Sequence, residues 1–204
     1  MSTNPMIPMT KLDAVNGMLA SIGQAPVNTL AVTGIRDVAI AELALDSVTR
    51  EVLNRGWSFN TDTDWPLAPD GNGNILIPTT ALDVDPVDRL SNYVQRDNGG
   101  TMMLYNKNDR TFVFTESVKC NVTWGFEFDT IPQVARTYIG TRAARIFQAN
   151  VVGSDLLFKF TELHEREARA AMERLEDQSQ DTNMLNSPTE ANMVIFHRRT
   201  NVLR

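Results

Sequence analysis

The sequence predicts an α+β protein, mainly α, in which a four-helix body carries an inserted antiparallel β-rich subdomain and an extended C-terminal tail. Apolar residues recur at steps of three and four toward both ends of the chain, which is helical spacing, whereas one central segment alternates as a strand does. From Asp181 onward the helical periodicity is lost and a proline appears. We therefore expect four segments, over residues 1–56, 57–130, 131–180 and 181–204.

Two helices are expected in the first segment. Thr10 and Asp13 have the spacing of a capping box, which predicts a helix over residues 11–22. A second helix is predicted over residues 36–55, because an apolar stripe at helical spacing contains Val38, Ala41, Leu45, Val48 and Val52.

The central segment is expected to contain short strands. Residues 62–74 contain Pro and Gly and are predicted to form a loop. Strand candidates follow at residues 75–77, 93–95, 102–105 and 112–114, separated by Asn-Gly-Gly and Asn-Asp turns. The clearest strand has one apolar face, formed by Cys120, Val122, Trp124, Phe126 and Phe128.

Two further helices complete the predicted body. The first has Pro132 in its first turn, runs to about Val151 and is ended by Gly153. The second is predicted over residues 155–178, with a common apolar face formed by Phe160, Leu163, Ala168, Ala171 and Leu175.

The other face of this last helix is charged. Glu162 with Arg166, and Glu165 with Arg169, are spaced as i,i+4 ion pairs worth ~0.2–0.5 kcal/mol each. Such a face is either solvated or a seam between subunits, where alternating charges set the register of neighbours. The candidate seam residues are Glu162, Glu165, Arg166, Arg169 and Arg174.

Composition limits the classes of function. The chain has 204 residues, a net charge of −6 and one cysteine, so it gives no global electrostatic reason to bind nucleic acid and cannot form an intrachain disulfide. The N-terminus lacks the pattern of a signal peptide, and no apolar run reaches the ~20 residues that cross a bilayer. We therefore expect neither secretion by a signal peptide nor a membrane anchor.

Residues with catalytic or metal-binding chemistry are sparse. His164 and His197 lie in different elements without further nitrogen or sulfur ligands at metal spacing, and Cys120 is expected to be a buried thiol. No phosphate-binding, dinucleotide-binding or nucleophile-elbow motif occurs in a suitable context. We therefore expect no cofactor, no metal and no enzymatic activity.

One enzymatic alternative rests on acidic residues near Trp57 and Trp65, where a sugar could stack. Glycoside hydrolysis needs two carboxyl groups ~5 to 9.5 Å apart. The candidates are Asp62, Asp64, Asp70, Asp83, Asp85 and Asp88. A glycan-binding or glycan-hydrolysing protein that uses these loop carboxylates is thus an alternative hypothesis, and an interaction domain without enzymatic chemistry is another.

Four sequence blocks occur in a defined order: AVNGMLASIGQAPVNTL at residues 14–30, REVLNRGWSFNTD at residues 50–62, IPQVARTYIGTRAARIFQ at residues 131–148, and EREARAAMERLEDQ followed by NML up to about Leu185. In this order they resemble tail tubular protein A, the adaptor or gatekeeper subunit of short-tailed bacteriophages. The specificity of the resemblance lies in the order of the blocks, since no catalytic signature is involved.

The resemblance implies a structural protein of the virion tail. Its subunits would form a twelve-fold ring below the portal protein and above the nozzle protein, tail tubular protein B, next to the tail fibre. Double-stranded DNA would pass through the lumen without specific binding during ejection. Subunits would be made in the cytoplasm of the bacterial host and stay monomeric until the portal templates the ring.

The resemblance also implies roles for parts of the chain. Residues 11–55 and 131–178 would form the ring body, and residues 56–129 would project toward the nozzle and fibre. The residues expected to face these partners are Trp57, Phe59 and Trp65. The tail after Asp181 would reach the portal, unless it is a frayed terminus or a strand laid on the parent domain. Its docking residues would be Met193, Val194, Ile195, Phe196, Arg198 and Arg199.

Overall fold

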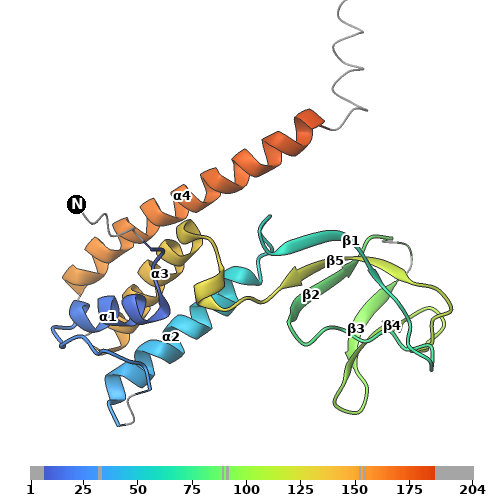
Figure 1. Cartoon of the computed structure of the whole chain (residues 1–204), viewed down its shortest axis with the longest axis horizontal. Coiled ribbons are helices and arrows are strands. Elements are labelled where there is room, and N and C mark those ends of the chain that lie inside the picture. The colour runs from blue at the N-terminus through green and yellow to red at the C-terminus, as the bar shows by residue number, and fades with distance from the viewer. Residues whose placement is uncertain are drawn as a thin grey trace, which may run out of the picture.

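The computed structural model describes residues 7–31, 34–88, 90, 92–151, 153 and 155–186. It confirms the predicted fold class, with a body of four helices and two small antiparallel sheets (Figure 1). The helix α3 lies at the centre of the body, because the other three helices all pack against it. The helices are α1 (Lys11–Ser21), α2 (Arg36–Leu53), α3 (Gln133–Val151) and α4 (Asp155–Asn186).

The helix α1 begins where the capping box predicts. The Thr10 hydroxyl accepts a hydrogen bond from the Asp13 backbone N–H at 3.2 Å, and the Asp13 carboxylate accepts from the Thr10 N–H at 2.9 Å. These two bonds satisfy backbone donors that a helix N-terminus leaves without intrahelical partners. At the other end the chain leaves the helix through Gly23, whose φ of 77° favours glycine.

The apolar stripe predicted for α2 forms one side of the helical core. All five of its residues are buried and pack with Tyr138 and Phe147 of α3, among others. The helix α3 begins at Gln133, directly after Pro132 rather than around it, and the chain turns after its end at Gly153, where φ is 66°. The helical periodicity of the sequence therefore located both helices to within about two residues.

The inward face of α4 differs from the predicted one. Glu165 and Met172 are buried and Ala168 packs on the core, whereas Leu163 and Leu175 are exposed. The carboxylate of Glu165 binds arginines on α3, and this interaction holds the Glu165–Ala168–Met172 side against the body. Ala171 is also exposed, and the Phe160 side chain lies outside the described residues. The predicted face is therefore right at Ala168 and wrong at Leu163, Ala171 and Leu175.

The end of α4 was also predicted too early. The backbone remains helical to Asn186, past the expected end at Gln178 and past the start of the expected tail at Asp181. The first residue that cannot continue a helix is Pro188, and the residue before a proline already disfavours helical geometry. No helix in the described part of the chain has the length and apolarity needed to cross a membrane.

The region between α2 and α3 contains two antiparallel sheets. The first has the strand order β1-β5-β2, and the second is the hairpin β3-β4. The strands are β1 (Thr61–Leu67), β2 (Ala81–Pro86), β3 (Tyr93–Asp97), β4 (Met102–Asn106) and β5 (Val118–Trp124). The candidates at residues 93–95 and 102–105 are confirmed as parts of β3 and β4.

Two strands lie where the sequence predicts none. The strand β1 occupies much of the predicted loop at residues 62–74, and β2 was missed because its Asp and Pro residues have low strand propensity. Both pair with β5, which supplies their hydrogen bonds. Pro66 is tolerated because β1 is at the edge of its sheet, where a missing N–H need not break a ladder. A register shift lies between Asp62 and Trp65.

Two strand candidates are shorter than predicted. Residues 75–77 and 112–114 form isolated bridges, from Leu76 to Met103 and from Asn74 to Val113. The alternation predicted to continue to Phe128 ends at Trp124, because Gly125 takes the chain out of the sheet. Phe128 begins the short 3-10 helix η1 (Phe128–Thr130) and is buried in the helical core instead.

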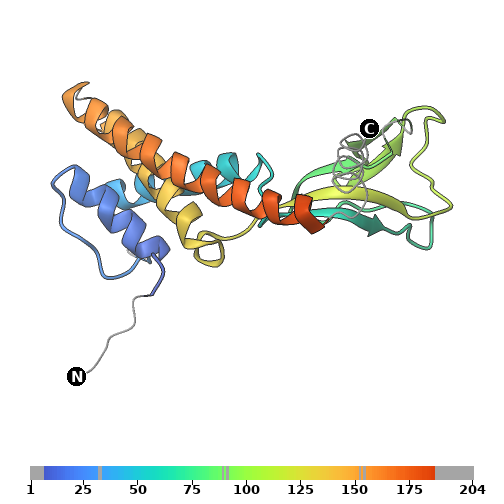
Figure 2. The same cartoon turned by 90° about the horizontal axis from the view of Figure 1, so that it is seen from above.

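A second core lies between the two sheets. Ile75, Leu104, Cys120 and Val122 are fully buried there, with Leu67, Val84 and Phe114 nearly so. Figure 2 shows the helices and the sheets at opposite ends of an elongated molecule, with α4 running along its length toward the sheets. The protein therefore has two separate cores, one in the helical body and one in the sheet region.

Candidate assembly surfaces

A buried joint connects the helical body to the sheet region. The Asn60 side chain is only 1% exposed. Its Nδ2 donates to the carbonyl of Leu53 at 2.9 Å and to that of Trp124 at 2.8 Å, and its Oδ1 accepts from the Trp57 N–H at 2.8 Å. One side chain thus ties the end of α2 to the end of β5, which fixes how the sheet region leaves the body.

Gly56 allows the chain to pass through this joint. Its φ is 70°, and a Cβ there would lie 3.1 Å from the Thr123 hydroxyl oxygen and 3.2 Å from that of Thr61. Both the left-handed backbone and the close approach of β1 and β5 therefore favour glycine. The Arg-Gly-Trp-Ser-Phe-Asn block is thus a structural connector.

An ion network fastens α4 to α3. Arg142 Nη1 lies 2.7 Å from Glu165 Oε1, Arg145 Nε donates to Glu165 Oε2, and Arg142 Nη2 lies 2.7 Å from Glu51 Oε1 on α2. Burial raises the pKa of Glu165, but hydrogen bonds and charge from Arg145 and Arg142 outweigh it, so the pKa is lowered. Glu165 is therefore an ionised, 7% exposed residue inside the body.

The other candidate seam residues lie on the surface of α4. The predicted Glu162–Arg166 pair forms, at 2.6 Å. The predicted Glu165–Arg169 pair does not form, because Glu165 faces α3; Arg169 pairs with Glu173 instead, at 2.7 Å. Arg174 is exposed and donates from Nε to the Ala170 carbonyl. The structure thus leaves Glu162, Arg166, Arg169 and Arg174 accessible to a neighbour, and Glu165 not.

The three residues expected to face nozzle and fibre lie in different environments. Trp57 is 8% exposed in the helical core, where its Nε1 donates to the Val52 carbonyl at 2.8 Å. Phe59 is half-buried against the same core. Trp65 is 43% exposed on β1, with its ring 5.8 Å from that of Trp124 in an edge-to-face contact. Of the three, Trp65 offers an accessible aromatic surface.

Three of the candidate acidic residues in the sheet region accept hydrogen bonds that stabilise turns or the sheet. Asp62 accepts from Trp124 Nε1 at 2.8 Å, Asp83 accepts from Gln95 Nε2 at 2.9 Å, and Asp70 accepts from the backbone of its own loop. Trp57 is buried and cannot stack on a sugar. These contacts favour turn and sheet roles over the glycan-hydrolysing alternative.

Cys120 and the histidines were also candidates for chemistry. Cys120 is fully buried, as expected, and burial followed by the charge of Asp85 raises the pKa of its thiol to about 11. The thiol is therefore neutral at pH 7 and shielded from reagents. Among the described residues there is no cluster of His, Cys, Asp and Glu that could hold a metal ion. His197 lies outside these residues.

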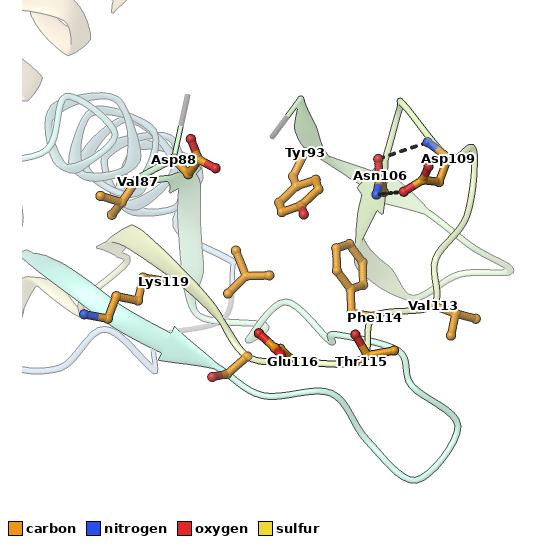
Figure 3. Close-up of a pocket in the computed structure, with 12 residues that line it drawn as sticks. Val87, Asp88, Tyr93, Asn106, Asp109, Val113, Phe114, Thr115, Glu116 and Lys119 are labelled. Carbon is orange, nitrogen blue, oxygen red and sulfur yellow. Dashed lines mark hydrogen bonds between the residues drawn. The ribbon is translucent and has the colours of Figure 1, made fainter. Parts of the chain in front are cut away.

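A cavity that the sequence did not indicate lies between the first sheet and the hairpin. It has a volume of about 550 Å³ and is lined by residues from β3, β4 and the segment before β5. The Tyr93 and Phe114 rings meet edge to face at 5.2 Å, and Figure 3 shows Asn106 and Asp109 on one side of them and Asp88 and Lys119 on the other. These residues are far apart in sequence, and no local motif could have found them.

The candidate portal-docking residues lie outside the described part of the chain. These are Met193, Val194, Ile195, Phe196, Arg198 and Arg199. Their role stays a prediction.

The helical body thus has charged and apolar residues exposed along α4, and it is joined through Asn60 to a sheet region that exposes aromatic residues of its own. A comparison with protein families shows which class of protein this is. The tail tubular protein family model matches residues 12–182, so the chain belongs to the tail tubular protein family. It is a structural component of a phage virion tail. No curated protein matches the chain.

Proposed function

We propose that this protein is the adaptor subunit of a ring that joins the portal to the tail nozzle of a short-tailed phage. The ring would help to build the short tail and would form part of the channel for DNA ejection. The family membership carries this proposal, because the match spans both the helical body and the sheet region. The host cytoplasm would be the place of assembly.

The two-part architecture supports an adaptor role. A closed ring needs two unlike side surfaces on each subunit, and an adaptor also needs separate surfaces for the rings above and below. Here the helical body would supply the two side surfaces that contact neighbouring subunits. The sheet region would contact the nozzle and the fibre through exposed residues such as Trp65. The Asn60 joint holds the two regions in a fixed relation, as registration between unlike rings requires.

The C-terminal end of the chain is proposed to meet the portal. The helix α4 extends past the rest of the body and carries the chain to Asn186, after which residues 187–204 follow. Residues 193–199 combine four apolar side chains with His197, Arg198 and Arg199, a composition suited to binding a partner rather than to forming a core.

The acidic net charge is compatible with a DNA channel. A net charge of −6 on each subunit, repeated around a ring, favours weak contact or repulsion between the lumen and the phosphate backbone. DNA would therefore slide through without specific binding.

Native mass spectrometry would test this function. We expect the purified chain alone to be a monomer, and mixing with the portal protein of the same phage to give one discrete ring-on-ring complex. A variant that lacks residues 187–204 should keep its circular dichroism spectrum and lose the complex. If the full chain forms no complex with portal at any salt concentration, the adaptor role is wrong.

A further inference from the structure

An open groove lies between α1, α3 and the first half of α4. It has a volume of about 250 Å³, and its floor is formed by small residues, Ala14 and Gly17 of α1 with Gly140 and Ala144 of α3. A Cβ at Gly17 would meet no atom within 4 Å, so the groove is open above this residue. Asp13 and His164 also line it. The groove is therefore a shallow apolar depression with an acidic residue in its wall.

A different side of the body carries a protruding side chain. Leu43 of α2 is 69% exposed, although it is flanked in sequence by the buried stripe of the same helix. Arg36 and Arg50 lie seven residues before and after it, and residues seven apart drift by only ~20° around a helix. The outer face of α2 thus presents a leucine between two arginines in one line, which we call the α2 stripe.

The charges on the two surfaces are opposite. Arg36 and Arg50 are exposed and form no ion pair with any residue in the described part of the chain. On α4, Glu167 is exposed three residues after His164, which lines the groove, and Glu167 likewise has no ion pair among the described residues. The stripe is therefore basic around a central leucine, and the groove is apolar with Asp13, which also caps α1, in its wall and Glu167 on the neighbouring surface of α4.

We propose that the groove of one copy receives the α2 stripe of the next copy, head to tail. Within one chain the two surfaces cannot meet, because the stripe points away from the core on which α1, α2 and α3 pack. Figure 1 shows α2 and α4 on opposite sides of α3, so the stripe and the groove face different neighbours. This seam rests on the proposed function, since unlike surfaces that repeat in one direction are what closes a ring.

Cysteine cross-linking on the portal-bound complex tests the seam. The double variant Leu43→Cys with Gly17→Cys should, on oxidation with copper phenanthroline, give a ladder of covalent multimers on a denaturing gel. Each seam would then hold one disulfide between copies. The native Cys120 is buried and should contribute no cross-link, so the unmodified chain gives the background. Leu43→Cys with Glu116→Cys, which places the second thiol on the sheet region, should give no ladder.

Charge reversal is the second test. Arg36→Glu with Arg50→Glu should abolish the complex with portal, whereas the matched control Lys107→Glu with Arg110→Glu makes the same change in net charge on the sheet region and should leave it intact. Adding Glu167→Arg to the first variant should restore at least part of the complex. Circular dichroism should be unchanged in all of these variants.

The failure of the seam is distinguishable from the failure of the function. If the unmodified chain forms a ring with portal but the Leu43 and Gly17 cysteines do not cross-link, the seam is elsewhere and the adaptor role stands. Covalent dimers from Leu43→Cys alone would show a two-fold contact and overturn the head-to-tail arrangement. A Gly17→Cys thiol that stays unreactive in the isolated chain would show that the groove is already closed within one chain, which also overturns the proposal.

Discussion

The helical body and the sheet region bury their side chains to very different extents. Of the largest fully buried side chains in the described residues, all but Ile75 and Leu104 belong to the helical body and the adjoining Ile131. Both regions also expose apolar residues, among them Leu43 and Leu163 on the body and Trp65 and Val113 on the sheet region. Buried apolar area is the main source of stability, so the body should contribute more to the stability of the chain than the sheet region does.

The largest expected effect is a cavity in the body. Phe147→Ala removes a fully buried ring from the helical core and should lower the free energy of unfolding by ~3–5 kcal/mol. Urea denaturation followed by circular dichroism measures this loss. Phe126→Ala, at a ring that is 40% exposed, is the control and should cost far less. Equal losses in the two variants would contradict the assignment of stability to the body.

The next effect is on the joint between the regions. Asn60→Ala leaves the Trp57 N–H and two carbonyls without their side-chain partner, which should cost on the order of 3 kcal/mol. We also expect the regions to unfold separately, so that Trp fluorescence and far-ultraviolet circular dichroism no longer change together. A single coincident transition in this variant would show that other contacts couple the two cores.

A smaller effect is expected from the ion network of α4. Because hydrogen bonds from arginine lower the folded pKa of Glu165 below its unfolded value of ~4.3, the ionised residue stabilises the fold above that pH. This contribution is lost as the pH falls through the folded pKa. Glu165→Gln should cost about 2 kcal/mol at pH 7 and should flatten the loss of stability on acidification.

The control for this prediction lies on the same helix. Glu167→Gln changes an exposed carboxylate and should keep both the stability at pH 7 and the pH dependence of the unmodified chain. Denaturation midpoints measured from pH 3 to pH 7 would separate the two variants. Identical curves for Glu165→Gln and Glu167→Gln would show that the network does not hold α4 in place.

The helices of the body could be predicted from the sequence because the patterns that indicate them are local. The Thr10–Asp13 capping box and the buried apolar face of α2 depend on residues within a few turns of one another. The side of α4 that faces the body was not predictable in this way, because Glu165 takes its place through Arg142 and Arg145 on another helix. Whether a charged side chain can be buried depends on its ion-pair partner, and the sequence does not show which residue that partner is.

The sheet region and the assembly surfaces depend on distant residues. The strands β1 and β2 contain Asp and Pro and become strands because β5 pairs with both. The sequence could not show that Trp57 is buried and Trp65 exposed, because the burial of Trp57 depends on its packing in the helical core. The groove joins residues from three helices, so it could be found only once those helices were placed.

The free edge of β1 has a consequence for a crowded tail. In the proposed ring, the sheet regions of neighbouring subunits would be close together and therefore at high local concentration. An open strand edge is a template for unwanted pairing between chains. On β1 this edge carries Pro66, which has no N–H to donate, and a register shift with Asp64 at a φ of 57°. These features disfavour pairing of β1 with a strand of another chain, which helps each sheet region to stay a separate unit.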